Sequence, residues 1–426
     1  MSKAKLSKTQ ILKNSTLIDG TGKKPVENAV VVIKDNRIEA VGSEGAVDEP
    51  HDATVIDVAG KTIMPGMIEL HAHIALVITA GRTHIPAQIE LRGRTFDVIP
   101  GIQEADEGTI ALRAAHFLKK SLDNGVTTVR DAGGNFKTVF AIKRSQHIGY
   151  FTGSRVRVCG DTIAIAGGHG RTEATGPWEC RKRVREAINA GADHIKIGTS
   201  HRPWRGREEF SMEELNALMD ETHKYGKRAM VHAAMPEGMI TSIKAGVDSV
   251  EHGPSEFDCE VDDETVKLMV DSDVWWVPTL LPFVQERPEM PQTGGTGVGA
   301  MPWEAELTRK WMSDIRELAP INFKKCLDAG VKIATGTDVL ARGLNFAPPH
   351  EEAIYFVKFG MKHMEAIKAA TYNAASCLGE EKTIGSIEAG KLADIIVVDG
   401  DPLEDITALR NVSLVMLDGN IVKNEL

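Results

Sequence analysis

The sequence predicts an α/β protein, a (β/α)8 TIM barrel with a small β-sandwich domain formed from both chain termini. The middle of the chain alternates eight strand-like runs with helical stretches, a pattern typical of a wound parallel sheet. β-rich runs without helices occupy the two ends. The 426 residues also exceed what one hydrophobic core usually organises.

The two ends of the chain share the same β character. From about residue 11 to residue 63 short β-rich runs alternate with turn signals, and the last fifty residues repeat this with Asp-Gly turns. Two such segments complete one sheet if the termini meet. We therefore expect residues 1–63 and 375–426 to form the composite sandwich, and residues 64–374 to form the barrel.

The barrel is predicted from its strands, the helices between them and two long loops. The strands are expected at 67–73, 126–131, 156–163, 194–198, 229–232, 249–252, 274–280 and 332–338. Helices are expected at 105–124, 181–192, 211–226, 262–273 and 319–330, several of them ending in Gly or Asn. Loops 74–107 and 282–301 are long and carry Gly and Pro, so we expect them to form lids or substrate walls.

Composition and charge narrow the class of partner. The chain is 42% hydrophobic and 26% charged, as in ordinary globular proteins, and its net charge is −10. This acidity disfavours nucleic acid and anionic membranes, and no signal peptide core or run of about 20 apolar residues is present. We expect a cytoplasmic protein that acts on a small-molecule substrate, and the sequence leaves a homo-oligomer open.

Cysteines and glycine-rich segments exclude two further classes of site. The five cysteines are scattered and show no C-x-x-C spacing, which argues against a disulfide framework or a structural zinc knot. The segments GTGKKP and GGTGVGA lack the sequence context of a phosphate loop.

The strongest local signal is PGMIELHAH, which places His71 and His73 at the end of the first predicted barrel strand. Side chains two residues apart on a strand point to the same side. At the carboxyl end of a barrel strand that side is the mouth, where active sites of this fold form. The pair therefore indicates metal binding, although a lone His-x-His pair also occurs incidentally.

Further polar residues end the later strands in order. Lys196 ends the fourth strand, His232 the fifth, His252 the sixth and Asp338 the eighth. Each alone also fits a structural role, as a hydrogen-bonded core histidine, a strand-end lysine or a helix cap. Together they place imidazoles and a carboxylate in one ring, which is the set of ligands that a metal site needs.

At this point the chain resembles the amidohydrolase superfamily, and more closely its imidazolonepropionase-like, prolidase-like branch of metal-dependent hydrolases. The resemblance covers nearly the whole chain and rests on KTIMPGMIELHAH, GVTTVRDAGG, IAGGHG, GADHIKI, VHA, VEHG, ATGTD and GSIEAGKLADIIVVDGDP.

The resemblance implies two divalent metal ions and a role for each residue of the ring. One metal would be held by His71, His73 and Asp338, and the second by His232 and His252, with Lys196 bridging both as a carbamate. Zinc suits such a site, while manganese, cobalt and iron stay open. Asp338 would also act as general base and acid.

Residues around the ring are candidates for contact with substrate. His169, in AIAGGHG, resembles a substrate-side group that donates a hydrogen bond to a carbonyl oxygen or a carboxylate, although it also fits a role in ordering its own loop.

Arg130 and Asp131 are interpreted as a structural pair at the barrel mouth. The chain departs from prolidase-like members after Lys196 and at Ala233 and Ala234, which puts peptidase specificity in doubt.

The segment after Lys196 is rich in cations and aromatic groups. His201, Arg202, Trp204, Arg205 and Arg207 fit an anionic or planar ligand, and equally a solvated loop.

The function that the resemblance implies is hydrolysis of an amide or peptide-like C–N bond by a hydroxide that two metals activate. A mononuclear deaminase or cyclic-amide hydrolase on the same barrel, without a carbamate on Lys196, is the alternative. A scaffold without activity fits poorly, because every expected ligand is present.

Overall fold

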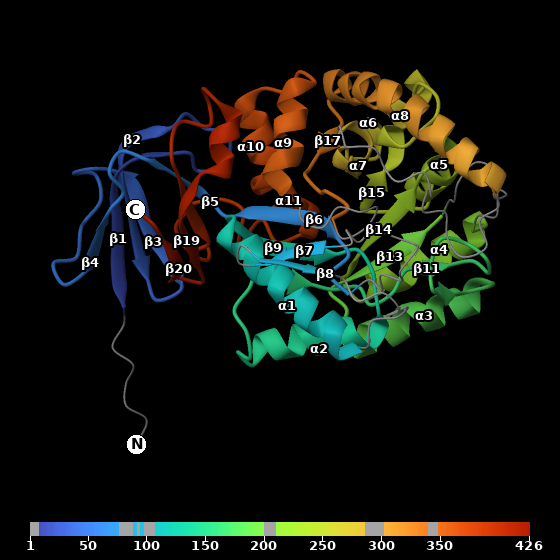
Figure 1. Cartoon of the computed structure of the whole chain (residues 1–426), viewed down its shortest axis with the longest axis horizontal. Helices are drawn as coiled ribbons and strands as arrows, with labels where there is room; N and C mark the ends of the chain where they lie inside the picture. Colours follow the sequence, from blue (N-terminus) through green and yellow to red (C-terminus); the bar gives the residue numbers. More distant parts are fainter. Residues whose placement is uncertain are drawn as a thin grey trace.

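The computed structural model describes residues 8–75, 88–91, 94–97, 107–199, 210–285, 302–339 and 348–426. Figure 1 shows the barrel with a sheet of strands from both ends of the chain beside it. The predicted fold class is thereby confirmed. None of the helices in the described ranges combines the length and apolar character needed to cross a bilayer.

An eight-stranded sheet joins the two ends of the chain, and we call it the terminal sheet. Its strands follow the order β20-β19-β18-β5-β1-β2-β3, with β4 added on β1. They are β1 (Thr9–Leu17), β2 (Val26–Lys34), β3 (Arg37–Ser43), β4 (Thr54–Asp57), β5 (Thr62–Pro65), β18 (Ile395–Val398), β19 (Val412–Leu417) and β20 (Asn420–Asn424). Antiparallel pairing of β5 with β18 holds the two ends together.

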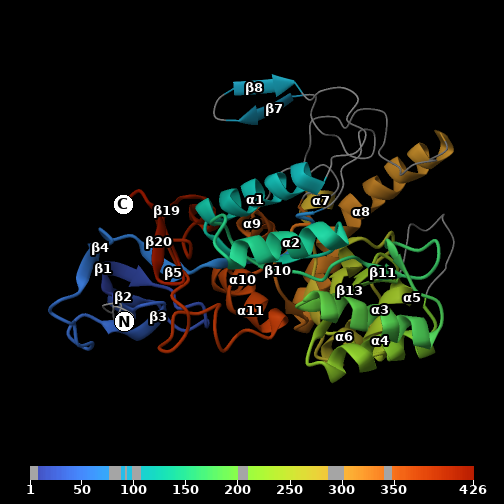
Figure 2. The same cartoon turned by 90° about the horizontal axis from the view of Figure 1, so that it is seen from below.

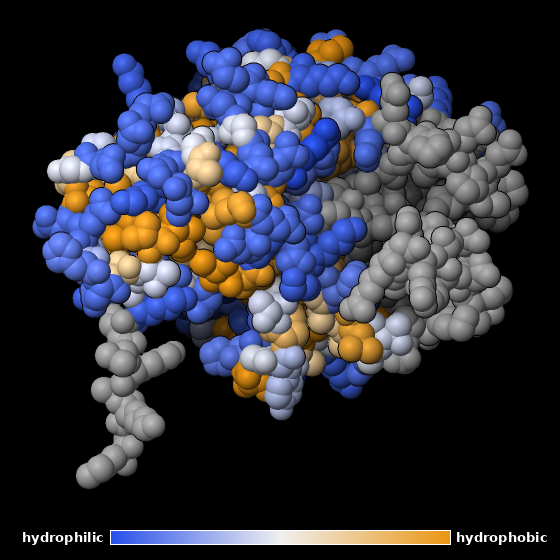
Figure 3. Space-filling view, turned by 60° about the vertical axis from the view of Figure 1, so that its left-hand side comes forward, coloured by the Kyte–Doolittle hydropathy of each residue, from blue (hydrophilic) through white to orange (hydrophobic). Residues whose placement is uncertain are grey.

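The terminal sheet has its own apolar core, to which both chain ends contribute. Leu12, Val31 and Ile63 from the first part are fully buried against Val397 and Leu414 from the second. Figure 3 brings this side forward and shows apolar side chains among polar ones on its surface. The limits of the two domains remain a prediction. Residue 374, where the barrel was expected to end, lies inside the helix Tyr372–Leu378.

The barrel is built from parallel strands in chain order. They are β6 (Met67–Ala72), β9 (Val126–Asp131), β10 (Arg155–Arg157), β11 (Ile163–Ala164), β13 (His194–Gly198), β14 (Arg228–Ala233), β15 (Ser249–His252), β16 (Trp275–Val277) and β17 (Lys332–Ile333). A bridge between Ala72 and Val339 closes the barrel at the mouth. The two sheets that make up the barrel also meet between β10 and β13. There the amide of Asp193 donates to the carbonyl of Val158 at 2.7 Å.

Three predicted strands are shorter than expected, and the one expected at 274–280 is β16, with only three residues (Trp275–Val277). The strand expected at 156–163 is divided between β10 and β11, because Gly160 between them has a φ of 89° that ends the extended backbone. Of the strand expected at 332–338, only β17 pairs with β16. Asp338 has a φ of 53°, so regular strand geometry cannot continue through it.

Helices surround the barrel on its outer face (Figure 1). They are α1 (Glu107–Asp123), α2 (Phe136–His147), α3 (Pro177–Ala190), α4 (Met212–Lys224), α5 (Pro236–Lys244), α6 (Asp263–Asp271), α7 (Leu281–Val284), α8 (Pro302–Ala329), α9 (Pro349–Lys358), α10 (His363–Ala370) and α11 (Tyr372–Leu378), with 3-10 turns η1 (Gly253–Ser255) and η2 (Ile406–Arg410). Local chemistry fixes several starts, as in α4, where Ser211 and Glu214 form a capping box.

One helix is longer than predicted, and the two predicted loops are partly structured. The helix expected at 319–330 is the second half of α8, whose first half also buries Trp311 and Ile315. Within loop 74–107, β7 (Gln88–Leu91) and β8 (Arg94–Asp97) form a hairpin that Figure 2 shows apart from the barrel wall. Loop 282–301 begins in α7, and its residues from 286 onward lie outside the described residues.

The two-residue strand β12 (Thr172–Glu173) pairs with β11.

Candidate metal centre

Five imidazole rings form a continuous row across the mouth of the barrel. The ring centroids of His73 and His71 lie 5.3 Å apart, and those of His71 and His252 lie 4.8 Å apart. His232 lies 4.5 Å from His252, and His169 stacks on His232 at 4.2 Å. Strands β6, β14 and β15, the residue directly after β6 and the loop after β11 supply these rings, so the fold brings together residues as far apart in the chain as His71 and His252.

One end of the row contains the first group of candidate ligands. The Nε2 atoms of His71 and His73 lie 3.7 and 3.2 Å from Oδ1 of Asp338. The Nδ1 of His73 contacts the carbonyl of Gly133 at 2.7 Å, an acceptor to which this nitrogen can only donate. That hydrogen bond leaves the Nε2 lone pair of His73 for a metal.

The second group lies further along the row. Atoms of His232, His252 and Glu256 that can bind a metal lie within 4.8 Å of one another, and all three residues are buried. Nδ1 of His252 contacts the hydroxyl of Thr279 at 2.7 Å. The described residues therefore contain two neighbouring groups of ligands of the type that divalent metals prefer.

Lys196 lies on β13, close enough to the site for its charge to interact with His71 and Asp338. Its flanking residues Ile195 and Ile197 belong to the main apolar core, while Lys196 alternates to the inner side. Its side chain is buried, and its Nζ has no hydrogen-bond partner within the described ranges. Burial lowers the pKa of Lys196 to about 8, although the charge of Glu251 opposes this shift. Burial likewise lowers the pKa of His71 well below its usual range.

A buried network of polar side chains contacts the row of imidazole rings at His71. Glu251, on β15, accepts from Arg130 Nη2 at 2.8 Å and from the hydroxyl of Ser249 at 2.7 Å. Its other oxygen lies 2.8 Å from Nδ1 of His71. A carboxylate in this position orients the imidazole and keeps the proton on Nδ1. Arg130, predicted to be part of a structural pair, therefore acts through Glu251.

Asp131, the other member of the predicted pair, fastens the loops at the mouth. Its carboxylate accepts from the amides of Ile74 and Gly133 at 3.0 and 3.2 Å, and burial raises its pKa to about 6. The hydrogen bonds of Arg130 go instead to Leu70, Ser249, Cys377 and Glu251, so the two side chains have different partners.

A second buried carboxylate joins the first and last strands. Glu69 accepts from the amide of His71 at 2.7 Å, and from the amide and hydroxyl of Thr337 at 3.0 and 2.8 Å. Thr337 directly precedes Asp338 in the sequence. Glu69 therefore fixes the backbone of two ligand-bearing segments relative to each other. Burial raises its pKa to about 8.

Two candidate ligands lie on strained backbone. His252 has a φ of 65° and Asp338 a φ of 53°, a region that residues other than glycine rarely adopt. Such conformations cost on the order of 1–3 kcal/mol each and occur most often at functional sites. The surrounding contacts must therefore hold these two side chains in place.

His169 lies at the open side of the row. Its side chain is exposed, whereas His232, on which it stacks, is buried. Gly198 at the end of β13 makes this arrangement possible, because a Cβ there would lie 2.3 Å from the carbonyl oxygen of His169. The loop of His169 can therefore pack directly over the end of β13.

Sequence reasoning missed several members of the site and placed others in a segment that is not described. Glu251, Glu256 and Thr279 were not predicted, although Glu251 and Glu256 flank His252 in VEHGPSE. Thr279 offered no signal, because its contact with His252 depends on the fold. The predicted contacts in the segment after Lys196 lie outside the described residues: His201, Arg202, Trp204, Arg205 and Arg207.

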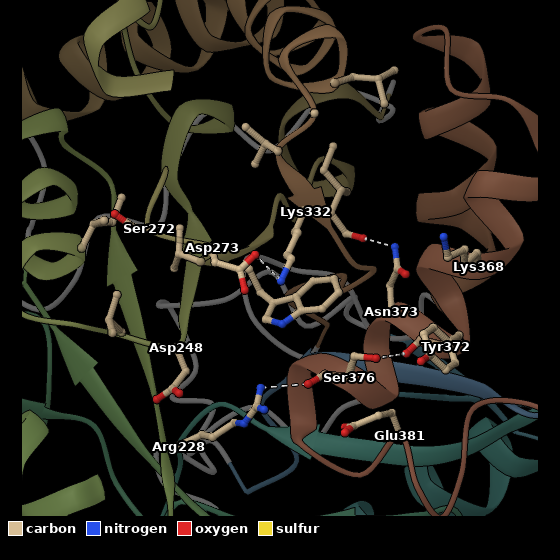
Figure 4. Close-up of a pocket in the computed structure, with 18 of the residues that line it drawn as sticks. Arg228, Asp248, Ser272, Asp273, Lys332, Lys368, Tyr372, Asn373, Ser376 and Glu381 are labelled. Atoms are coloured by element: carbon tan, nitrogen blue, oxygen red, sulfur yellow. Dashed lines mark hydrogen bonds and ion pairs between the residues drawn. The ribbon is translucent and has the colours of Figure 1, made fainter. Parts of the chain in front are cut away.

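A separate pocket lies at the opposite, amino-terminal end of the barrel strands. Figure 4 shows Arg228, Asp273 and Lys332 in its wall. Arg228 donates to the carbonyls of Ser376 and Cys377, while Lys332 is paired with Asp273. Both cations therefore already have partners within the protein. We expect the active site at the other end of the barrel, at the carboxyl ends of the strands, as is usual for this fold.

The parallel barrel carries two groups of candidate metal ligands, histidines and carboxylates, at the carboxyl ends of its strands. This arrangement is typical of metal-dependent hydrolases built on a barrel. The chain belongs to the amidohydrolase family, whose model matches residues 62–422. It is thus an enzyme that acts on carbon–nitrogen bonds.

The chain is similar to several named proteins over nearly its whole length. It is 27% identical to ochratoxinase of Aspergillus niger, over 95% of this chain and 84% of that protein. It is 24% identical to imidazolonepropionase of Clostridium tetani, over 93% and 91%. A crystal structure of a Xaa-Pro dipeptidase with methionine bound in its active site is 28% identical with a TM-score of 0.80, covering 98% of this chain and all of that one.

Proposed function

We propose that the protein is a binuclear metal-dependent hydrolase that cleaves an exocyclic or peptide-like amide bond of a small molecule. The observation that carries the proposal is the placement of two ligand groups side by side, with Lys196 buried in the same barrel mouth. The names of the relatives, ochratoxinase and Xaa-Pro dipeptidase, support this choice of substrate class.

The residues present fit two divalent metals, for which zinc is our choice. His71 Nε2 is buried without a hydrogen-bond partner in the described chain, as is Lys196 Nζ. Such atoms are costly to bury unless something else engages them. His71, His73 and Asp338 would hold one ion, and His232 and His252 the other. Two bound ions would supply an acidified water and a polarised carbonyl.

Lys196 would join the two groups as a carbamate. Its lowered pKa makes the neutral amine accessible near neutral pH, and only the neutral amine attacks carbon dioxide. The ammonium first loses one proton to give the neutral amine, and the nitrogen loses a second proton as the new N–C bond forms, so that a cation becomes an anion. An ammonium facing two dications would be repelled, whereas the carbamate oxygens are suitable ligands.

Asp338 is assigned the proton transfers. Its carboxylate oxygen lies beside Nε2 of His73 and of His71, at the centre of the first ligand group. From there it would take the proton of the attacking water and give it to the leaving nitrogen. His169, exposed at the open side, would donate a hydrogen bond to the substrate carbonyl or to a substrate carboxylate.

The limits of the two domains, the loop contacts of His201, Arg202 and Arg205, and the cytoplasmic location are retained as parts of this proposal. The sandwich would comprise residues 1–63 and 375–426, and the barrel residues 64–374.

Metal analysis and a panel of substrates test the proposal. We expect about two metals per chain, an intact-mass increase for the Lys196 carbamate under gentle conditions, and turnover of some N-acyl amino acids or dipeptides. Cyclic amides and amino-heterocycles complete the panel. One metal per chain, an unmodified Lys196, and ammonia release without amide cleavage would instead establish the mononuclear deaminase.

A further inference from the structure

A buried hydroxyl contacts the back of the second ligand group. Thr279 Oγ1 lies 2.7 Å from Nδ1 of His252, and both residues are almost fully buried. Thr279 follows β16, the strand next to the one that ends at His252. We propose that Thr279 is a positioning residue, whose hydroxyl holds the direction of the His252 imidazole and accepts from its Nδ1 when Nε2 binds a metal.

The backbone of Thr279 indicates that its position is imposed by its surroundings. Its φ is 49°, in the left-handed region. For a β-branched residue this is a true outlier, which persists only where neighbouring contacts over-determine it. Local preference therefore does not place threonine here, and the contact with His252 is the interaction that the side chain makes.

A carboxylate from another part of the barrel anchors this loop. Glu352, buried on α9, accepts from the amide of Leu280 at 2.6 Å and from that of Leu281 at 3.1 Å. These are the two residues directly after Thr279. Glu352 thereby holds the backbone at the point where the chain leaves Thr279, which keeps this residue beside His252.

The histidine is fixed from its own side as well. His252 has a φ of 65°, and its carbonyl accepts from Trp276 Nε1 at 2.8 Å. Trp276 lies on β16 and is fully buried. The ends of β15 and β16 are thus fastened to each other by one backbone and one side-chain contact to the same histidine.

The hydroxyl is compatible with the metal-binding tautomer, because Oγ1 of Thr279 can accept the proton that Nδ1 of His252 carries in that tautomer. When Nδ1 of His252 donates its proton to Thr279 Oγ1, the lone pair of the imidazole is on Nε2, the nitrogen that can then bind a metal. Without the hydroxyl, the ring loses this hydrogen bond and can rotate. This inference rests on the proposed function, because it assumes a second metal at His232 and His252.

Zinc titration of four proteins tests the inference. The wild type, Thr279→Val, Thr279→Ser and Thr222→Val are stripped with a chelator and titrated with Zn²⁺ against a chromophoric competitor. Thr222 is the matched control, since it is also fully buried and its hydroxyl bonds a carbonyl, that of Leu218, at 2.7 Å on α4.

We expect two zinc ions in the wild type. Thr279→Val should weaken the binding of one ion by about 10- to 100-fold, the usual effect of losing a partner of a ligand. The other ion should bind normally, Thr279→Ser should restore the lost affinity, and Thr222→Val should bind like the wild type. If the valine variant does not fold, Thr279→Gly replaces it, because glycine adopts a positive φ without strain.

Three results would overturn the inference while leaving the proposed function intact: wild-type affinity for both ions in the hydroxyl-free variants, a serine variant as weak as valine, or an equal loss in Thr222→Val. A wild type that binds one zinc ion would overturn the proposed function, and this inference with it.

Discussion

Replacing Glu251 with Gln should weaken metal binding without unfolding the barrel. The carboxylate accepts from Arg130 and Ser249 on one side and contacts His71 Nδ1 on the other. Glutamine has one acceptor oxygen, which the guanidinium of Arg130 will attract. The NH₂ group must then face His71 and donate to Nδ1, which forces the ring proton onto Nε2.

The expected size of this effect follows from the role of Nε2. A protonated Nε2 cannot ligate, so the tautomer must be reversed before a metal binds at His71. Losing such a partner typically reduces metal affinity by about 10- to 100-fold, which corresponds to about 1.4–2.8 kcal/mol. Glu251→Ala should in addition lower the free energy of unfolding by about 3–5 kcal/mol, because it leaves the buried Arg130 uncompensated.

Competition titration with zinc measures the first effect, and urea denaturation of the metal-free proteins measures the second. Glu221→Gln is the control, because that carboxylate is also buried and binds the guanidinium of Arg185 on the helical side of the barrel. A Glu251→Gln protein that binds zinc as tightly as the wild type would refute the assignment of Glu251 to His71.

Three further predictions concern Asp338, Lys196 and Glu69. Asp338→Asn should abolish most turnover, by about 100-fold or more, while part of the metal is kept; steady-state rates near those of the wild type would show that another group moves the proton. Lys196→Ala should empty at least one metal site and abolish activity, and short carboxylic acids added with metal should restore some rate; full metal content and rate in this variant would contradict a bridging role. In the metal-free protein, burial raises the pKa of Glu69 from 4.5 to about 8, so the folded chain binds more protons between these values and the free energy of unfolding falls as the pH rises through them. Glu69→Gln should remove this part of the slope in urea titrations at several pH values, and an unchanged slope would mean that Glu69 is not the group responsible.

The fold was predictable because its signals are local and repeated. Each barrel strand is a short apolar run between helices, and His71 and His73 show their common side through a spacing of two. The strand ends that bear Lys196, His232 and His252 were also found within one or two residues. Where the prediction was wrong, in the strand expected at 156–163, a glycine with positive φ divides the run, and sequence alone does not reveal its conformation.

The residues that support the site could not be predicted in the same way. Glu251, Thr279 and Glu352 act through contacts that join segments far apart in the chain, such as the 72 positions between Leu280 and Glu352. No local periodicity marks such pairs. Their presence is a property of the closed barrel, in which the inner side chains of different strands meet.

The terminal sheet has a consequence for the order of events during synthesis. Met64 on β5 pairs with Ile396 on β18, and Gln10 donates to the carbonyl of Gly419, 409 positions away. At roughly 5–20 residues per second, the N-terminal strands would wait on the order of 20–60 s for their partners. During that time the edge of β5 is a template for pairing with other chains. Nascent chains on one messenger are thus exposed to strand exchange until the last fifty residues leave the ribosome.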